Sequence, residues 1–311
     1  MLRWRGVRIC PTVRSRPNSS DGGRTWHDPL WSARVLLEQP ALIASVHDAY
    51  FAAGADVAIT ATYQASFEGF ARRGLTRQQA AGVMQQAVAI ACDARDRFWQ
   101  GNDHRVVGRA RPLVVASVGP YGAFLADGSE YRGDYALTED ELRRWHDARF
   151  TVLAQSGADL LACETIPSGA EARALLTLLE QHPGVQAWFS FTARDGTHIA
   201  NGEPFAGLAE ELGAHPQVVA VGINCTAPEH VASLLRAARQ ATSARLVVYP
   251  NSGETYLPID RRWVRSGSCG TLVDGAREWL EAGATLIGGC CRTTPDDIRA
   301  LEQWGGARAA T

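Results

Sequence analysis

Three cysteines, placed just after two short apolar segments, are the residues of this sequence best suited to chemistry. Cys290 and Cys291 are neighbours and follow the run Leu-Ile-Gly-Gly at 286–289, and Cys225 follows Gly-Ile-Asn at 222–224. Zinc prefers tetrahedral thiolate sites, and three protein ligands leave a fourth position open, as in catalytic zinc sites. The alternative is that these cysteines are small buried core residues, which is common for free thiols. We predict a zinc ion (Zn2+) on Cys225, Cys290 and Cys291.

The expected chemistry of such a site is thiol chemistry. A zinc ion held by three thiolates is electron-rich and activates water poorly, but it binds a substrate thiol and keeps it as a nucleophilic thiolate at neutral pH. No Ser–His–Asp arrangement stands out among the eight histidines, so the nucleophile would come from the substrate. A zinc hydrolase would need water-activating His or carboxylate ligands. A metal store or redox sensor would bind zinc without turnover.

Other polar residues also stand at or just past the ends of apolar segments. Glu164 ends an otherwise apolar segment, and we expect it to face a ligand ammonium, because buried carboxylates are rarely left unpaired. Cys163 is its neighbour on the same predicted strand, so alternation points Cys163 away from the site. The loops at 119–123 and 250–254 are suited to binding a carboxylate through backbone donors. The predicted substrate-binding residues are Tyr63, Gln64, Tyr121, Glu164, Thr165, Asn224, Asn251 and Ser252.

Aromatic residues at predicted strand ends suggest a cation-binding cage. Aromatic faces attract cations such as a sulfonium or a quaternary ammonium. For each residue taken alone, it is equally plausible that the aromatic ring covers the end of the barrel core. The residues concerned are Tyr63, Tyr121, Phe191 and Tyr249.

The elements that must position these residues alternate between strands and helices. Strands are predicted to start near residues 57, 113, 159, 187, 218, 246 and 285. Their nearly continuous apolar character indicates a parallel sheet covered on both faces. Helices are predicted at 41–53 and 76–99, after capping boxes at Thr138 and Ser168, and from Pro295 onward.

This alternation predicts a (β/α)8 TIM barrel. The active site of such a barrel lies at the carboxyl ends of its strands, where the polar residues above gather, and strands 6 and 8 are close enough for Cys225 to face the other two cysteines. Seven strands are visible after residue 55, so the eighth should lie before residue 41. An open doubly wound sheet is the alternative, but no Gly-x-Gly-x-x-Gly follows any predicted strand.

The overall composition excludes several classes of protein. The chain has 311 residues, 46% of them hydrophobic and 21% charged, with a net charge of −2. This gives no support for nucleic acid as a partner, and no apolar run approaches the roughly 18 residues needed to cross a membrane. Seven cysteines, two of them adjacent, fit a reducing compartment with free thiols better than a disulfide framework. We therefore expect a cytoplasmic protein.

Five motifs together resemble the zinc-dependent homocysteine S-methyltransferases. They are Gly-Gly-Cys-Cys-Arg-Thr-Thr-Pro at 288–295, Gly-Ile-Asn-Cys at 222–225, Ser-Val-Gly-Pro-Tyr-Gly-Ala at 117–123, Ala-Cys-Glu-Thr at 162–165 and Tyr-Pro-Asn-Ser-Gly-Glu at 249–254. The resemblance covers about residues 26–304. The stretches Leu-Trp-Ser at 30–32 and Tyr-Arg-Gly-Asp-Tyr at 131–135 are similar to the short branch that uses S-methylmethionine.

The resemblance implies a specific reaction on a (β/α)8 barrel. Zinc would be held by Cys225, Cys290 and Cys291, and homocysteine thiolate would attack the methyl group of a sulfonium in line, yielding methionine. Glu164 matches the family's contact to the homocysteine amino group. The donor would be S-methylmethionine or, second, S-adenosylmethionine, and a close variant of the reaction uses selenocysteine as acceptor. The fourth zinc ligand and the oligomeric state, monomer or homo-oligomer, are left open.

Residues 1–25 depart from this family, whereas 26–311 are expected to form the homocysteine-binding barrel domain. Met1 to Ser20 contains five arginines and no acidic residue, with no strand or helix period. A transit peptide or a disordered tail would explain this composition. The family begins instead with a strand followed by Asp-Gly-(Gly/Ala)-x-x-Thr-x-Leu-Glu, so we expect strand 1 to be missing or replaced.

A shift of reading frame is the interpretation we favour for residues 1–25. Translated back with codons rich in G and C and shifted by one base, residues 10–23 become Leu-Pro-Asp-Gly-Ala-Leu-Ala-Thr-Glu-Leu-Glu-Arg-Arg-Gly, which contains the family motif. A slip in a guanine run near Gly22 and Gly23 would produce it. We then expect the 311-residue chain to be weakly stable or an inactive zinc-binding barrel. Sequencing the coding DNA across this run, and assaying the purified chain, tests the hypothesis.

Overall fold

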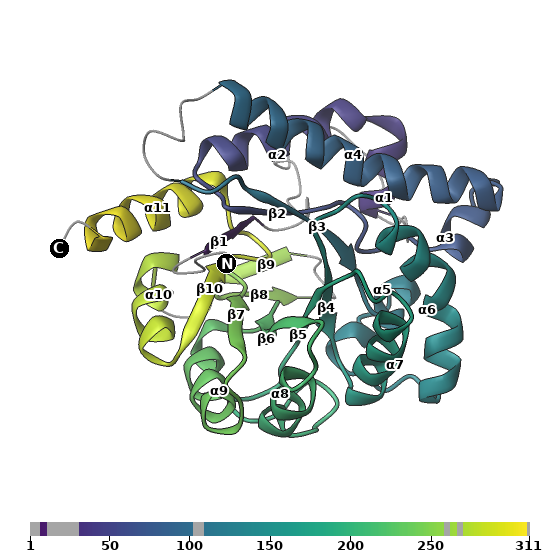
Figure 1. The fold of residues 1–311 in the computed structure, drawn as a ribbon. Coiled ribbons are helices and arrows are strands. Elements are labelled where there is room, and N and C mark those ends of the chain that lie inside the picture. Colours follow the sequence, from purple (N-terminus) through teal and green to yellow (C-terminus); the bar gives the residue numbers. More distant parts are fainter. Residues whose placement is uncertain (1–6, 11–30, 102–108, 258–261, 266–269, 310–311) are drawn as a thin grey trace.

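Parallel strands close into a barrel wrapped by helices (Figure 1). The computed structural model describes residues 7–10, 31–101, 109–257, 262–265 and 270–309. The barrel order is β1-β10-β7-β6-β5-β4-β3-β2. Its strands are β1 (Val7–Cys10), β2 (Val57–Ile59), β3 (Leu113–Val118), β4 (Leu160–Ile166), β5 (Ala187–Phe191), β6 (Val218–Asn224), β7 (Arg245–Tyr249) and β10 (Ala284–Gly288). The prediction of a (β/α)8 TIM barrel is confirmed.

Helices follow the strands and cover the outside of the barrel (Figure 1). They are α1 (Trp31–Glu38), α2 (Pro40–Ala52), α3 (Phe67–Ala71), α4 (Arg77–Gly101), α5 (Tyr121–Leu125), α6 (Glu139–Ala154), α7 (Gly169–Glu180), α8 (Phe205–Gly213), α9 (Pro228–Ala241), α10 (Leu272–Glu281) and α11 (Pro295–Ala309), with a short 3-10 turn at Ser129–Tyr131.

A strand, β1, occupies the place of strand 1 and lies before residue 41, as the count of strands predicted. The expectation that strand 1 is missing is therefore wrong, and its replacement by a different segment stays a prediction. β1 pairs in parallel with both β10 and β2, with Val7 opposite Leu286 and Ile9 opposite Val57. A barrel with a gap would leave the N–H and C=O groups of two strand edges without partners, and even a four-residue strand satisfies them. The sequence showed no alternation of apolar and polar residues here, because a strand of four residues near several arginines is too short to reveal one. The other predictions for residues 1–25 fall on residues outside the described ranges, and the division at residue 25 stays a prediction.

The apolar core consists of two clusters, one inside the barrel and one in the layer between the strands and the helices. Successive side chains of a strand point to opposite faces, so alternate residues fill the interior. Cys163 packs in the outer layer, as alternation predicted, while its neighbour Glu164 belongs to the other face. The interior cluster consists of Val57, Ile59, Val115, Leu160, Ala162, Trp188, Ala220, Cys225, Val247, Tyr249, Leu286 and Cys290.

Helix starts follow the predicted capping chemistry in part. Thr138 and Glu141 form a reciprocal capping box at the start of α6. At α7 the Ser168 side chain accepts from the Glu171 N–H, but the Glu171 carboxylate does not complete a box and binds elsewhere. Its partners are described with the site below.

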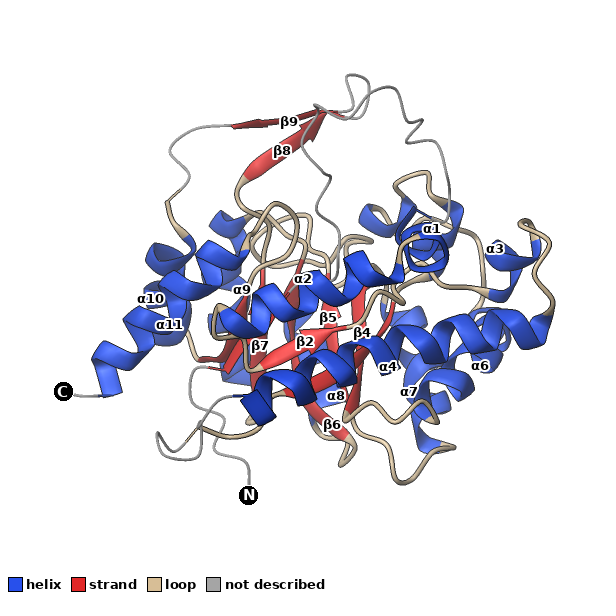
Figure 2. Cartoon of the chain, turned by 90° about the horizontal axis from the view of Figure 1, so that it is seen from above, coloured by secondary structure: helices blue, strands red, loops and turns tan. Residues whose placement is uncertain are grey.

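The connection from β7 to α10 contains an antiparallel hairpin that the sequence did not predict. β8 (Glu254–Leu257) pairs with β9 (Arg262–Arg265) in a separate two-stranded sheet. Figure 2 shows this hairpin standing away from the barrel, on the side of the loops that follow the strands. Among the described helices, none has the length and apolar character needed to cross a membrane.

Buried His47 on α2 is expected to make the fold sensitive to acid. Neither ring nitrogen has a hydrogen-bond partner among the described residues, and burial lowers the pKa of His47 to about 4 although the charge of Asp48 acts against this. The unfolded chain binds a proton below about pH 6.5, so stability is lost as the pH falls from there toward about 4. We expect a loss of about 2 kcal/mol between pH 7 and pH 5 from this group. Urea unfolding at both pH values should show a smaller pH effect in His47→Leu, and an equal effect in both proteins would contradict the assignment.

Candidate metal centre and substrate site

The three predicted cysteine ligands meet at one point of the barrel mouth. The sulfur atoms of Cys225, Cys290 and Cys291 all lie within 4.8 Å of one another. Cys225 Sγ lies 3.8 Å from Cys291 Sγ, and two Zn–S bonds of about 2.3 Å at a tetrahedral angle place sulfurs about 3.8 Å apart. Cys225 is 3% exposed and Cys290 5%. The three-sulfur donor set, and the spacing of Cys225 and Cys291, therefore fit a zinc ion.

The structure joins Cys225 to Cys290 as a disulfide, which differs from the expectation of free thiols. Their Cα atoms are 5.6 Å apart, within the ordinary range for disulfides. The closeness that suits a shared metal ion also allows oxidation. Metal binding requires thiolates, so this pair must be reduced before all three cysteines can act as ligands. Among the described residues, Cys92, Cys163 and Cys291 are free cysteines.

A tight turn after β10 presents Cys290 and Cys291. Cys290 N–H donates to Pro250 O at 2.8 Å, and the Thr293 hydroxyl donates back to Cys290 O at 2.7 Å. Gly289 is required here, because a Cβ atom at this position would lie 2.3 Å from Thr293 Cγ2. The Tyr50 hydroxyl holds the same turn from α2 by donating to Thr293 O at 2.9 Å. Main-chain contacts thus fix the two adjacent ligands.

Glu164 lies inside the barrel, on the face that alternation predicted. Its side chain belongs to a residue only 2% exposed, and one carboxylate oxygen accepts a hydrogen bond from the Ser117 hydroxyl of β3. Burial raises the pKa of Tyr249 on β7 well above its usual value, and the nearby charge of Glu164 adds to this effect. The hydroxyl of Ser117, on the neighbouring strand, therefore holds the carboxylate.

Thr165 and Asn224, both predicted to bind substrate, bind each other in the structure. Asn224 Oδ1 accepts from Thr165 N at 2.8 Å, and Asn224 Nδ2 donates to Thr165 Oγ1 at 2.8 Å. Thr165 has φ of 62° and Cys225 has φ of 48°, values in the left-handed region that are unfavourable for residues with a Cβ atom. The Asn224 amide thus stabilises a strained turn beside Glu164. Asn224 also directly precedes Cys225, a predicted metal ligand whose backbone is strained.

Removing the Asn224 amide should cost both stability and activity. Asn224→Ala leaves the buried Thr165 N–H without its acceptor, for which we expect a loss of about 1–3 kcal/mol in unfolding free energy. We also expect at least about a tenfold fall in kcat/KM, because the turn beside Glu164 relaxes. The matched control is Asn201→Ala, which removes an exposed amide bonded to Glu203 and should change stability by less than about 1 kcal/mol. Equal effects of the two substitutions would contradict this role of Asn224.

Asn251 and Ser252 lie beside the cysteines and retain unused polar atoms. Ser252 N–H donates to Cys291 O at 3.1 Å, and Asn251 N–H donates to Thr226 O at 3.1 Å. Their side-chain atoms Asn251 Oδ1 and Ser252 Oγ are buried and have no hydrogen-bond partner among the described residues. Buried polar atoms are normally satisfied, so these two are available to a polar ligand at the metal centre.

The aromatic residues at the strand ends do not form a common cation cage. Phe191 packs in the outer layer against Phe205, and the Tyr249 hydroxyl lies 3.1 Å from Trp188 Nε1 and 2.6 Å from Ser190 Oγ. Tyr121 stacks edge-on against Tyr135 and Trp145 at centroid distances of 5.3 and 5.0 Å. Tyr121 keeps partial exposure. Phe191, Tyr249 and Tyr121 therefore pack in three separate places.

The other predicted aromatic and amide positions follow β2. Tyr63 is 4% exposed, and its carbonyl accepts a hydrogen bond from the buried Arg149 at 3.4 Å. Gln64 is half-buried and donates to Ala123 O at 3.4 Å, which connects the β2 loop with α5. Both residues lie at the carboxyl ends of the strands, and neither of these contacts assigns them to a substrate.

Glu171 is a buried residue whose role the sequence did not reveal. Its Oε1 accepts from Tyr121 N at 2.6 Å and lies 2.8 Å from His146 Nε2, and its Oε2 accepts from the Tyr135 hydroxyl. Burial lowers the pKa of His146, opposed by the bond to Glu171, so the neutral ring donates its Nε2–H. The carboxylate therefore fixes the loop that carries Tyr121. The sequence pattern indicates only its part in a helix cap.

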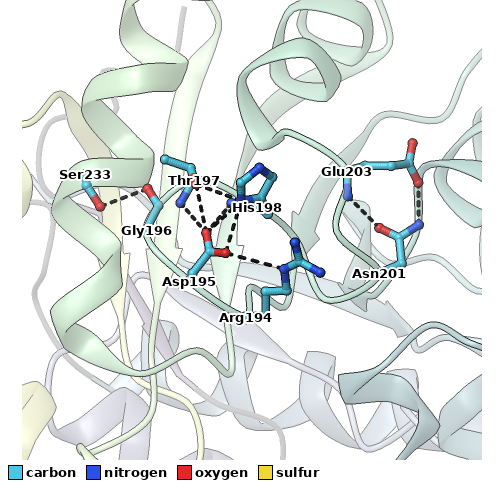
Figure 3. A network of polar contacts seen from close by, with 8 residues as sticks. All are labelled: Arg194, Asp195, Gly196, Thr197, His198, Asn201, Glu203 and Ser233. Atoms are coloured by element: carbon cyan, nitrogen blue, oxygen red, sulfur yellow. Dashed lines mark hydrogen bonds and ion pairs between the residues drawn. The ribbon is translucent and has the colours of Figure 1, made fainter.

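The loop after β5 is held by its own polar network (Figure 3). Asp195 accepts from the N–H groups of Thr197 and His198, each at 2.8 Å, which keeps the pKa of Asp195 well below its usual range. The loop is tied to its neighbours through Glu203, which accepts from Gly169 N at 2.8 Å, and through Ala193 N, which donates to Thr226 Oγ1 at 2.9 Å. These bonds connect the ends of β4, β5 and β6 around the metal centre.

Comparison with known proteins gives concordant matches along most of the chain. The homocysteine S-methyltransferase family matches residues 20–304. Homocysteine S-methyltransferase YbgG of Bacillus subtilis is 49% identical over 289 residues, which cover 93% of this chain and 91% of that protein. A homocysteine S-methyltransferase of Escherichia coli is 48% identical over 276 residues, with 88% of each chain covered.

Solved structures of similar sequence share the fold. The metallated form of the homocysteine methyltransferase MmuM from Escherichia coli superposes with a TM-score of 0.84 at 43% identity, and 96% of each chain is covered. The oxidised form of the same protein also gives a TM-score of 0.84, at 44% identity and with the same coverage.

Proposed function

Because the chain belongs to the homocysteine S-methyltransferase family, we propose that it transfers a methyl group from a sulfonium donor to the thiol of homocysteine, yielding methionine. The observation that carries this proposal is the meeting of three cysteine sulfurs within 4.8 Å at the barrel mouth, with a buried carboxylate at the end of a strand of the same barrel. Such a site can bind both the thiol and the ammonium of one amino acid.

Zinc is the metal that these residues fit best. Cys225, Cys290 and Cys291 supply only sulfur, and the 3.8 Å spacing of two of them matches tetrahedral thiolate coordination. When bound, zinc lowers the pKa of a substrate thiol, so that the nucleophile is available as a thiolate near neutral pH. The similar Escherichia coli enzyme MmuM has a metallated form, which supports a metal here.

The chain's own residues bind and orient homocysteine. We assign the ammonium to Glu164, and the carboxylate to the region of Asn251 and Ser252, where the Ser252 hydroxyl can donate. The homocysteine sulfur then forms a bond to the methyl carbon while the donor's sulfur–methyl bond breaks. The bonding electrons return to the donor sulfur, which leaves as a neutral thioether, and the thiol proton passes to solvent.

We propose S-methylmethionine as the preferred donor and S-adenosylmethionine as the second. The support is the sequence at 30–32 and 131–135, which resembles the branch that uses S-methylmethionine. Selenocysteine is the alternative acceptor, because a selenocysteine Se-methyltransferase of Brassica oleracea is 43% identical over 290 residues. A cytoplasmic location, where thiols stay reduced, is part of the same proposal.

One assay tests these assignments together. The reduced, zinc-loaded protein is incubated with homocysteine or selenocysteine and with each sulfonium donor, and methionine or Se-methylselenocysteine is quantified. We expect methionine from homocysteine, fastest with S-methylmethionine. Zinc binding without any methyl transfer would instead support an inactive barrel.

A further inference from the structure

One buried carboxylate joins both ends of the loop between β3 and α6. Glu171 of α7 is 0% exposed. Its Oε1 accepts from Tyr121 N at 2.6 Å, at the start of this loop, and its Oε2 accepts from the Tyr135 hydroxyl, near the end of the loop. Burial raises the pKa of Tyr135, and the charge of Glu171 adds to this effect, so the phenol keeps the proton that it donates. His146 Nε2, on α6, donates to Oε1 at 2.8 Å. Glu171 therefore clamps the loop at both ends.

The middle of the loop lies over the ends of β4 and β5. Glu130 O accepts from the hydroxyl of Thr192, which directly follows β5, at 3.0 Å. Gly133 has φ of 67°, and a Cβ atom at this position would lie 2.9 Å from the carbonyl oxygen of Pro167, which directly follows β4. The loop thus crosses the carboxyl ends of two neighbouring strands, on the face of the barrel where the cysteine sulfurs meet.

The two tyrosine rings at the ends of the loop form an aromatic pair. The ring centroids of Tyr121 and Tyr135 lie 5.3 Å apart in an edge-on arrangement, and both residues are half-buried. Aromatic faces attract cations, and a phenol that donates to a carboxylate is polarised, which makes its ring richer in electrons. The pair is therefore suited to a ligand with a positive charge and apolar substituents, as a sulfonium has.

The place of this pair in the barrel favours the methyl donor over the thiol substrate. The predicted metal ligands follow β6 and β10, and β3 stands opposite β7, the strand between those two, in the barrel order. Figure 1 shows α5, α6 and α7 on the side of the barrel away from β7 and β10. A homocysteine sulfur bound at the cysteines directs its free lone pairs toward this opposite wall. In-line attack therefore requires the methyl group and its sulfonium on that side.

We propose that Glu171 is a positioning residue, which holds the rings of Tyr121 and Tyr135 in place for the sulfonium group of the methyl donor. This rests on the proposed function, in which a sulfonium methylates homocysteine. Three N–H and O–H groups converge on the carboxylate, so the loop keeps one arrangement and the donor meets rings that are already in place. A role limited to stability would affect the use of both substrates to the same extent.

The experiment measures kcat and the KM of each substrate in the reduced, zinc-loaded wild type, in Glu171→Gln and in Tyr135→Phe. Glu171→Gln keeps the volume of the side chain but leaves one acceptor oxygen for three donors, whereas Tyr135→Phe keeps the ring and removes one donor. We expect KM for S-methylmethionine to rise about tenfold in Glu171→Gln and about threefold in Tyr135→Phe, and KM for homocysteine to change less than about twofold in both. The control is Glu180→Gln at the other end of α7, whose side chain is 54% exposed and which should change neither KM.

Equal rises of KM for both substrates, or no rise for S-methylmethionine, would overturn the proposal. In the double variant, KM for S-methylmethionine should rise less than the product of the two single effects, because both residues act through one hydrogen bond, and a full product would also contradict it. Should Glu171→Gln fail to fold, Tyr135→Phe keeps the carboxylate and tests the same bond. A wild type that makes no methionine from any donor would reject the proposed function and this proposal with it. Normal wild-type turnover with an unchanged donor KM in the variants would reject the role of Glu171 alone.

Discussion

Replacing Cys290 with alanine is expected to abolish metal binding and methyl transfer together. The three sulfurs lie within 4.8 Å of one another, and loss of one leaves two thiolates, which hold zinc far more weakly. We expect zinc content to fall from one ion per chain to a small fraction. Methionine formation should fall by at least about 1,000-fold, because the substrate thiol then stays mostly protonated near neutral pH.

The measurements are metal analysis of the purified reduced protein and the rate of methionine formation. Cys163→Ala is the matched control, since Cys163 is fully buried in the outer layer, away from the barrel interior, and its pKa is raised by burial. That variant should keep its zinc and most of its activity. Full activity of Cys290→Ala without bound metal would show that the cysteine cluster is not the catalytic site.

The second large effect is expected from Glu164→Gln. The substitution keeps the shape of the side chain and removes its charge, so the proposed interaction with the homocysteine ammonium would become a neutral hydrogen bond. Bonds to charged groups are stronger than neutral ones, and a difference of about 3 kcal/mol corresponds to about a 100-fold loss in kcat/KM. The loss should appear mainly in KM, since the ammonium is remote from the reacting sulfur.

Zinc content and thermal unfolding of Glu164→Gln should stay close to those of the wild type. The matched control is Glu210→Gln on α8, an exposed carboxylate outside the barrel. We expect this variant to change neither kcat nor KM. Activity of Glu164→Gln within threefold of the wild type would remove Glu164 from the substrate site and leave the metal assignment intact.

The arrangement of the strands could be predicted because chemistry and pattern agree along the chain. Seven apolar segments were located within about two residues, and the rule that parallel strands share one active face brought Cys225, Cys290 and Cys291 together from the sequence alone. Alternation along β4 also separated Glu164 from Cys163 correctly.

Contacts between elements that are distant in the sequence could not be predicted. Asn224 and Thr165 looked like ligand-binding groups because they are polar and stand at strand ends, but the left-handed backbone of Thr165 requires the Asn224 amide. Glu171 matched a capping box, yet its carboxylate binds His146 and Tyr121, which lie on other elements. Rules for helix caps and strand alternation describe neighbouring residues only, so they cannot reveal which distant residues come into contact. β1 escaped prediction for a different reason, since its neighbours rather than its own four residues define it.

The positions of the metal ligands also have a consequence for the mechanics of the barrel. Cys225 and Cys290 are 65 residues apart, and the segment between them contains β7, the β8–β9 hairpin and α10. An ion bound to both ends would act as a cross-link, and closing a loop of this length costs an unfolded chain on the order of 4 kcal/mol in entropy. The ion that serves the reaction would then also stabilise the segment between Cys225 and Cys290. We expect this segment to unfold first when the metal is lost, and the melting temperature to depend on the concentration of free metal.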